Sequence, residues 1–303
     1  MPSPIQYIAH QDIDQHRWDA CIGHASNGLI YAMADYLNAM SPNWDALVLG
    51  DYEAVMPITW RKKMGIRYLC QPAFSQQLGI FFANKGLQEH VPAFLRKLSL
   101  RFRLTEIFLN YQNHTEGITA THTNFVLPLL HSYATIASAY RGDLVKNLNR
   151  TKKFSLQYHT SQNVAEAINL YRQQYGKRMN MQEQDYSNFI MLAEKLLQEG
   201  KAIVRHVTLQ NGELLATGLF LKDQNRIYNL SSTTLPNGRT LEANHFLIDG
   251  LIKEFAGSGL TLDFEGSDLP GVARFYQKFS PINQPYFFWK SNRLPAVLRW
   301  WKK

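Results

Sequence analysis

Two carboxylates lie close together in the last third of the chain. Asp263 and Glu265 flank Phe264, and in a strand both acidic side chains would face the same side because side chains alternate. Transfer of a group to an amine needs a carboxylate that holds the ammonium group or removes its proton, and a neighbouring carboxylate can raise the pKa of such a base. We therefore predict a catalytic role for Glu265, with a structural role beside Arg274 as the alternative.

Short polar or amide side chains form two further candidate groups. Asn229 and Ser231 end the predicted strand 226–232, where they suit a substrate site and equally any strand that enters a loop. Tyr68, Gln71 and Gln77 lie in an amide- and aromatic-rich stretch, whose side chains can bind sugar or peptide edges by stacking and hydrogen bonding. We predict that both groups bind substrate.

The sequence lacks the residues or motifs that several other kinds of site require. Cys21 and Cys70 are the only cysteines, so we expect neither a disulfide framework nor a cysteine zinc site. The ten histidines show no metal-binding pattern, and we expect no metal. No phosphate-binding loop, dinucleotide fingerprint or Gly-x-Ser-x-Gly motif is present. The net charge of +8 suits an anionic partner such as a nucleotide, tRNA or a membrane surface, without choosing among them.

The elements that position these residues are of mixed type. Apolar residues recur at helical spacing over 87–102 and 241–255, and buried strands are predicted at 105–111 and 260–264. A hairpin is predicted around residues 211–212, where Asn-Gly favours a tight turn. No apolar run reaches the ~18 residues of a membrane span, and the first residues lack a long apolar core. We therefore expect an α/β (α+β) protein of the cytoplasm, without a signal peptide.

The same order of elements occurs twice along the 303 residues. A turn, a helix and a strand recur in order at an offset of about 155 residues: 50–53 with 211–213, 91–102 with 244–255, and 105–111 with 261–267. This pattern predicts a duplicated α/β unit. We place the boundary at a polar, basic helix over 132–154, which gives domains 1–152 and 153–303.

Three stretches have the character of a known family. They are YRGDLVKNLNRTKK (140–153), LDFEGSDLPGVARFYQKFSP (262–281) and PITWRKKMGIRYLCQPAFSQQLG (57–79). The C-terminal half resembles the GNAT acyltransferase superfamily, and the tandem arrangement resembles the FemABX-type aminoacyltransferases and related two-domain N-acyltransferases. The resemblance implies two GNAT-like domains, each a mixed twisted sheet flanked by helices, and transfer of an acyl or aminoacyl group to an amine.

The resemblance also implies roles for residues near the C-terminus. Residues 275–281 are similar to the GNAT pattern Leu-Tyr-x-Lys-x-Gly-Phe up to its lysine. This likeness implies that Tyr276 is the general acid for the leaving group, and we expect Arg274 and Lys278 to bind substrate. The alternative for Tyr276 is a tyrosine that packs a short helix.

The segment that would hold a CoA donor departs from the family. GNAT enzymes that use acetyl-CoA carry Arg/Gln-x-x-Gly-x-Gly/Ala at a helix start, where backbone N–H groups hold the pyrophosphate. Residues 239–244 keep Arg239, which we predict to bind substrate. Glu242 and Asn244 replace the two glycines of the pattern. We therefore expect weak or absent acetyl-CoA binding, no firmly bound cofactor, and either aminoacyl-tRNA or an acyl-CoA as the donor.

These observations predict an acyltransferase in which an acceptor amine attacks the donor carbonyl directly. The second domain would carry the chemistry and the first would shape the acceptor side, with a cell-envelope precursor as the acceptor class that the resemblance suggests. Two alternatives stay open: a non-catalytic GNAT-like binding protein, and a conventional acetyl-CoA-dependent N-acetyltransferase with a divergent phosphate loop.

The aromatic and basic C-terminal tail has two interpretations. Residues 286–289 are predicted to form a last core strand. Residues 294–303, with Arg299, Lys302 and Lys303, are either an exposed chain end or an anchor for an anionic membrane surface. The anchor would place the protein peripherally at the inner face of the membrane.

Overall fold

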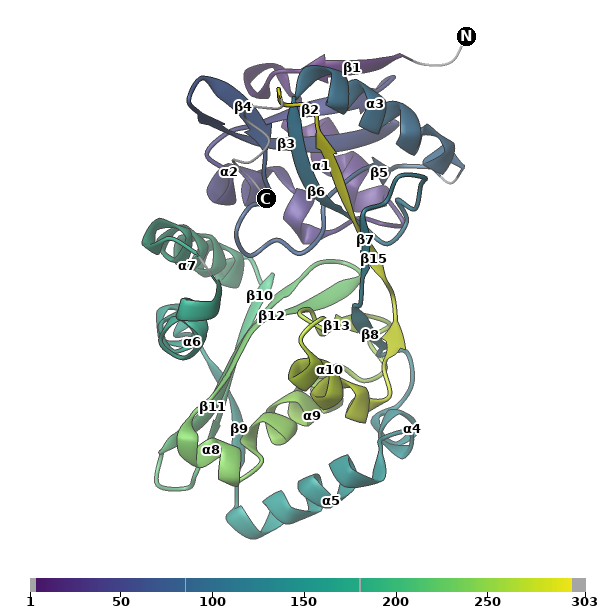
Figure 1. The fold of residues 1–303 in the computed structure, drawn as a ribbon. Helices are drawn as coiled ribbons and strands as arrows, with labels where there is room; N and C mark the ends of the chain where they lie inside the picture. The colour runs from purple at the N-terminus through teal and green to yellow at the C-terminus, as the bar shows by residue number, and fades with distance from the viewer. Residues whose placement is uncertain (1–3, 85, 180, 296–303) are drawn as a thin grey trace. The chain divides into compact units, whose positions relative to one another are not determined.

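The computed structural model describes residues 4–84, 86–179 and 181–295, and the chain divides into two compact units. One unit comprises Met1–His122 with Pro285–Lys303, and the other comprises Thr123–Gln284 (Figure 1). Each unit is built on its own sheet. No helix among the described residues has both the length and the apolar character needed to cross a membrane.

The first unit is a mixed sheet in the order β1-β2-β3-β4-β6-β15-β7, with β5 paired to β3. Asp14 caps the first helix by accepting a hydrogen bond from the backbone N–H of Arg17 (3.1 Å). The helix before β6 begins with a proline in its first turn and buries one face. Its elements are β1 (Ile5–Ile8), α1 (Gln15–His24), α2 (Ala34–Met40), β2 (Trp44–Leu49), β3 (Ala54–Lys63), β4 (Ile66–Leu69), β5 (Phe81–Phe82), α3 (Val91–Arg101), β6 (Leu104–Leu109), β7 (Ala120–His122) and β15 (Tyr286–Asn292).

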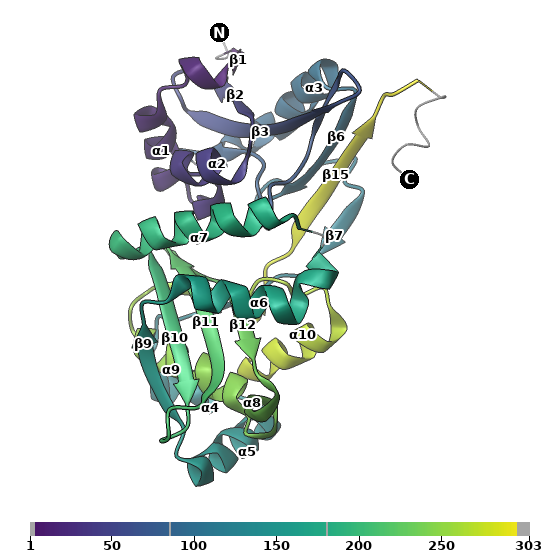
Figure 2. The same cartoon turned by 90° about the vertical axis from the view of Figure 1, so that its left-hand side faces the viewer.

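The second unit is a sheet in the order β14-β8-β13-β12-β11-β10-β9. Figure 2 shows α6 and α7 on one face of this sheet and α9 on the other. Its elements are β8 (Phe125–Pro128), α4 (Tyr133–Ser138), α5 (Gly142–Thr151), β9 (Gln157–Ser161), α6 (Val164–Met179), α7 (Glu183–Gln198), β10 (Ala202–Thr208), β11 (Leu214–Lys222), β12 (Arg226–Thr234), α8 (Pro236–Thr240), α9 (Ala243–Phe255), β13 (Thr261–Asp263), α10 (Pro270–Tyr276) and β14 (Ile282–Asn283). This mixed α/β architecture confirms the predicted fold class.

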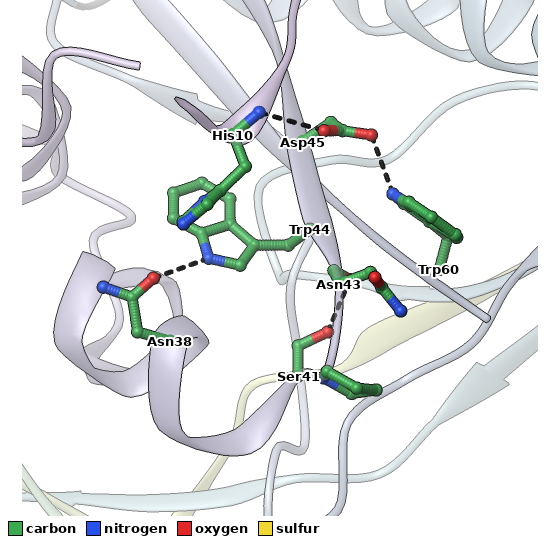
Figure 3. A pocket seen from close by; sticks show the side chains of 8 residues that line it. His10, Asn38, Ser41, Asn43, Trp44, Asp45 and Trp60 are labelled. Carbon is green, nitrogen blue, oxygen red and sulfur yellow. Dashed lines mark hydrogen bonds between the residues drawn. The ribbon is translucent and has the colours of Figure 1, made fainter. Parts of the chain in front are cut away.

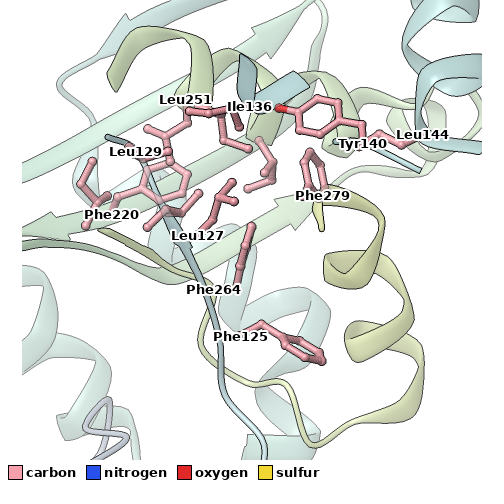
Figure 4. Close-up of a cluster of buried hydrophobic side chains, with 14 of the residues drawn as sticks. Phe125, Leu127, Leu129, Ile136, Tyr140, Leu144, Phe220, Leu251, Phe264 and Phe279 are labelled. Atoms are coloured by element: carbon pink, nitrogen blue, oxygen red, sulfur yellow. The ribbon is translucent and has the colours of Figure 1, made fainter. Parts of the chain in front are cut away.

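The division into units differs from the predicted boundary at 152/153. Ile136, Tyr140 and Leu144 of α4 and α5 are buried in the apolar core of the second unit, together with Phe279 (Figure 4). In the other direction, β15 leaves the second half of the chain and pairs with β6 of the first unit. The predicted basic helix over 132–154 is two helices, and its apolar face attaches it to the unit that follows. A local pattern does not show such an exchange of strands, because it does not say which sheet a strand joins.

The two units share an order of elements, as the repeat predicted. In each, an edge strand is followed by two helices, then antiparallel strands, a helix and a further strand. The strands after α3 and α9 each pair in parallel with an earlier strand, β6 with β4 and β13 with β12. The predicted strand 286–289 is confirmed as part of β15. Residues 296–303 of the predicted membrane anchor lie outside the described residues.

Strands β12 and β13 run together for only three residues. They pair in parallel from Arg226↔Thr261 to Tyr228↔Asp263, where β13 ends, while β12 continues to Thr234. The pairing of β12 with β11 also shifts register within this stretch, which marks a β-bulge. Beyond residue 228, β12 therefore has a side that β13 does not cover, and the candidate site lies there.

Candidate active site

A chain of hydrogen bonds joins Tyr276 to the uncovered part of β12. The Asn229 side-chain amide donates to the Tyr276 hydroxyl oxygen (Nδ2–Oη 3.1 Å), and the Ser232 hydroxyl donates to Asn229 (Oγ–Oδ1 2.6 Å). Asn229 is buried, and the ring of Tyr276 stacks on Phe264 with 4.7 Å between centroids. Since the phenol oxygen accepts a bond from Asn229, its own proton can be donated to another group.

Burial is the main cause that raises the pKa of Tyr276. Tyr171 and the Glu265 carboxylate raise this pKa further, the carboxylate because its negative charge disfavours the phenolate. A phenol in this environment stays protonated at neutral pH. It can therefore act as a general acid, and it is a poor general base.

Glu265 lies just after β13, where the backbone leaves the strand. Its φ is +56° and that of Gly266 is +53°, so the alternation expected from a continuing strand stops at Asp263. The Glu265 backbone N–H donates to Asp263 (N–Oδ1 3.1 Å), and the Ser267 hydroxyl donates to the Glu265 carbonyl oxygen (3.1 Å). The Glu265 carboxylate contributes to the raised pKa of both Tyr171 and Tyr276, because a negative charge disfavours the phenolate form.

Asp263 has a structural position. Its carboxylate accepts from Arg226, with which it forms a buried ion pair, and from the Asn124 side chain (Nδ2–Oδ1 3.0 Å). Arg226 also donates to Gln284 (Nη2–Oε1 3.0 Å). The two ends of the short β12–β13 pairing are thus tied by one charge pair, and Arg274 is not the partner of this carboxylate.

Two site residues were missed in the sequence, Tyr171 and Tyr175 of α6. They are four residues apart on one helix face, and their ring centroids are 5.3 Å apart. Burial is the largest cause that raises the pKa of Tyr171 to about 12, followed by the nearby Tyr186, Tyr175 and Glu265. The spacing of the two tyrosines was a visible signal. That α6 lies over β12 was not visible (Figure 2).

The other predicted residues of the second unit have different surroundings. Ser231 of β12 is buried, and its hydroxyl has no hydrogen-bond partner among the described residues. Arg239 of α8 is exposed and donates to Gln174 of α6 (Nη2–Oε1 3.2 Å). Arg274 is exposed and donates to the carbonyl oxygen of Pro270 within α10 (3.3 Å). Lys278 forms an ion pair with Asp143 of α5 (Nζ–Oδ2 3.1 Å), which links the turn after α10 to α5 at the surface.

A carboxylate of the chain itself lies at the N-terminus of α9. Glu242 is the residue before the helix, with φ +59°, and pairs with Arg150 (Oε1–Nη2 2.8 Å) and with His245 (Oε2–Nδ1 2.8 Å). The same Arg150 nitrogen donates to the Thr240 carbonyl oxygen (2.8 Å). Helix N-termini attract anions, and here an internal carboxylate already supplies the negative charge.

The predicted residues of the first unit make local contacts. The Gln77 amide donates to Gln76 (Nε2–Oε1 2.6 Å), and the Gln71 amide donates to the carbonyl oxygen of Ser75 (3.3 Å). The side-chain oxygens of Gln71 and Gln77 are buried without a hydrogen-bond partner within the described chain. Tyr68 lies on β4 opposite Arg61. These residues belong to a different unit from Tyr276, and their role in binding substrate stays a prediction.

A small pocket of about 310 Å³ opens in the first unit (Figure 3). Asp45 accepts from the Trp60 indole (Nε1–Oδ2 2.7 Å) and from the backbone N–H of His10 (3.0 Å). The Trp44 indole donates to Asn38 (Nε1–Oδ1 2.9 Å). These polar atoms of the pocket form hydrogen bonds with one another, and we assign no chemistry to the pocket. In the parts of the chain that the structure describes, no group of three or more His, Cys, Asp or Glu side chains could hold a metal ion.

Comparisons with known proteins agree with this architecture. Residues 139–276 match the family model described as an acetyltransferase (GNAT) domain. Among solved structures, the chain is similar to FemX, with 12% identity, a TM-score of 0.65 and coverage of 93% of this chain and 96% of FemX. It is also similar to L-PGS from Bacillus licheniformis, with 12% identity, a TM-score of 0.54 and coverage of 94% and 93%. At this identity the likenesses concern the fold.

A third similar structure is a tandem GNAT protein from the clavulanic acid biosynthesis pathway. The identity is 11% and the TM-score 0.53, with 97% of this chain and 100% of the other covered. No curated protein sequence gives a significant match. The family match begins within the segment that joins α4 to α5, so it falls inside the second unit described above.

Proposed function

Because this chain has a tandem GNAT-like fold with a GNAT domain at residues 139–276, we propose that it is an N-acyltransferase. The observation that carries the proposal is the Tyr276 phenol, which is held by Asn229 where β12 and β13 part and has a raised pKa. An acid placed there can protonate the leaving group of an acyl donor.

The proposed step is a direct attack by the acceptor amine. The amine nitrogen forms a bond to the donor carbonyl carbon, and the bond from that carbon to the leaving sulfur or oxygen breaks. Tyr276 gives its proton to the leaving thiolate or alkoxide. The Glu265 carboxylate takes the proton that the attacking nitrogen loses, and it lies close enough to raise the pKa of Tyr276. The chain then needs no covalent acyl-enzyme, and both cysteines lie in the first unit.

The donor is proposed to be one that does not depend on a pyrophosphate at the start of α9. Glu242, with its partners Arg150 and His245, occupies that position with negative charge. The FemABX resemblance implies aminoacyl-tRNA as the donor, and a cell-envelope precursor with a free amine as the acceptor class. An acyl-CoA held in another way is the alternative donor.

The function is tested by following transfer of a radiolabelled group from aminoacyl-tRNA, and separately from acetyl-CoA, to a panel of amines that includes peptidoglycan precursors. Label that moves to an amine faster than it does without protein supports an acyltransferase. A pool of aminoacyl-tRNAs and several acyl-CoAs that all fail, with protein that is folded by circular dichroism, would overturn the proposal. Such a result would favour the non-catalytic binding protein. The Glu242 carboxylate at the start of α9 supports that alternative.

The pH dependence of transfer is predictable from Tyr276. A general acid is active while protonated, and a raised pKa extends its protonated range to higher pH. We therefore expect kcat/KM to show no fall on the alkaline side up to about pH 10, the ordinary pKa of tyrosine. The rate is measured across pH 6 to 10, and circular dichroism at each pH controls for unfolding. A fall below about pH 9 in folded protein would point to a different acid.

Removal of the Glu242 carboxylate is expected to open the start of α9 to anions. Glycine suits the positive φ at this position, and Glu242→Gly would leave Arg150 and His245 without their negative partner. We expect no micromolar affinity of the natural chain for CoA, and a gain of about tenfold or more in the variant. Calorimetry with CoA measures both.

A matched control for Glu242→Gly is Glu199→Gln, which removes a carboxylate from the end of α7. It should leave CoA affinity unchanged. Micromolar CoA binding by the natural chain, or an equal gain in the control, would show that Glu242 does not exclude this donor.

A further inference from the structure

One stretch of the first unit carries a large excess of positive charge. The stretch from 54 to 105 contains one acidic residue, Glu89, and nine basic ones: Arg61, Lys62, Lys63, Arg67, Lys85, Arg96, Lys97, Arg101 and Arg103. Its net charge of +8 equals that of all 303 residues, so the rest of the chain is neutral in sum. A local excess of positive charge of this size suits an anionic partner.

The hairpin β3–β4 in this stretch has an unusual tip. Its turn is Met64-Gly65, with φ of +49° and +79°, a conformation for which Asn-Gly is preferred. Methionine in a left-handed conformation adds backbone strain, and yet Met64 is 81% exposed. Lys62 and Lys63 precede it on the hairpin. The sequence thus keeps an apolar side chain at an exposed point where a polar residue would fit the backbone better.

A second exposed apolar side chain lies at the same end of the sheet. Strand β4 pairs in parallel with β6 at Tyr68↔Leu104, so the hairpin tip and the turn from α3 into β6 are at one end of the sheet. Leu100, in the last turn of α3, is 72% exposed, and Arg103 follows it. We call Lys62, Lys63, Met64, Leu100 and Arg103 the basic tip.

We propose that the basic tip docks the first unit onto an anionic lipid surface. Lysine and arginine side chains meet lipid phosphates, while Met64 and Leu100 enter the boundary between headgroups and acyl chains. A nucleic acid would use the same cations, but it offers no apolar layer for these two side chains. The proposal goes beyond acyl transfer, because docking needs no substrate.

The first experiment measures sedimentation of the full chain with vesicles. Vesicles of phosphatidylcholine with one third phosphatidylglycerol should bind the protein, and vesicles of phosphatidylcholine alone should bind it far more weakly. Lys62→Gln with Lys63→Gln should weaken binding to the anionic vesicles roughly 30-fold, since each basic residue near such a surface contributes about fivefold. Lys195→Gln with Lys201→Gln removes the same charge from α7 and the turn after it, and should have little effect.

The second experiment separates lipid from nucleic acid. Met64→Asn suits the positive φ of the turn, so it should keep or raise the melting temperature while it weakens vesicle binding about fivefold. Binding of a bulk tRNA, measured with the same variants, should not respond to Met64→Asn. The proposal is overturned if the α7 pair weakens vesicle binding as much as the hairpin pair. It is also overturned if Met64→Asn leaves vesicle binding intact, or if tRNA binds tightly while anionic vesicles do not.

Discussion

Tyr276→Phe is expected to slow acyl transfer about a hundredfold to a thousandfold while leaving the fold intact. The substitution removes only the hydroxyl that would protonate the leaving group, a contribution that general acids make at this scale. The phenyl ring keeps its place on Phe264, and the Asn229 side chain keeps its bond from Ser232. Single-turnover rates with the donor found by the transfer assay measure the effect, and the loss should fall on kcat more than on KM.

Tyr133→Phe is the matched control for this prediction. It removes another half-buried hydroxyl of the second unit, one that donates to Asp249 (3.0 Å). That tyrosine has a raised pKa from burial and from Asp249, yet no contact with Tyr276 or Asn229 is found for it. It should lower stability slightly and leave the rate of transfer unchanged. Equal rates for Tyr276→Phe and the natural chain would remove Tyr276 from the mechanism.

Part of this candidate site was predictable because two of its residues belong to neighbouring predicted strands or directly follow one. Asn229 lies on the predicted strand 226–232 and Glu265 directly follows the predicted strand 260–264, and these two strands are neighbours in the sheet. Tyr276, which the resemblance to the GNAT pattern implied, is hydrogen-bonded to Asn229. The structure adds what pattern does not contain. Glu265 takes a left-handed conformation, which turns it out of the alternation assumed for a continuing strand.

The surroundings of residues that depend on tertiary packing were not predictable from the sequence. Arg274 and Lys278 are near Tyr276 in sequence, but one faces solvent and the other pairs with Asp143 of α5. Tyr171 comes from a helix about a hundred residues earlier, and only the packing of α6 on β12 brings it in.

The domain boundary shows the same limit. Residues 132–154 were predicted as one polar, basic helix, and such a pattern does not show which unit the apolar residues of α4 and α5 pack against. Similarly, β15 was recognised as a strand, and its place beside β6 follows only from long-range pairing. Each unit completes its sheet with a strand from the other half of the sequence, since β8 joins β13 while β15 joins β6.

Asp263→Asn is expected to destabilise the second unit by about 3–5 kcal/mol, because it leaves the buried Arg226 guanidinium without a charged partner. Arg226 is 6% exposed and Asp263 1% exposed, and their ion pair joins the first residue of β12 to the last residue of β13. Asparagine has the same shape and can still accept from the Glu265 N–H, so the loop itself should persist. For a unit of this size the melting temperature should fall by about 10 °C, as measured by calorimetry.

Two further variants test whether the loss of stability comes from the unpaired charge of Arg226 or from the Asp-to-Asn change itself. Asp51→Asn removes the same charge from an exposed pair with Arg17, where solvent screens it, and should not change the melting temperature measurably. Arg226→Met added to Asp263→Asn removes the unpaired guanidinium and should recover part of the loss, since the cost arises from a charge without its partner. If the double variant is less stable than Asp263→Asn alone, the loss comes from hydrogen bonds of Arg226 such as that to Gln284. The pair would then stabilise the β12–β13 junction through its hydrogen bonds and not through its charge.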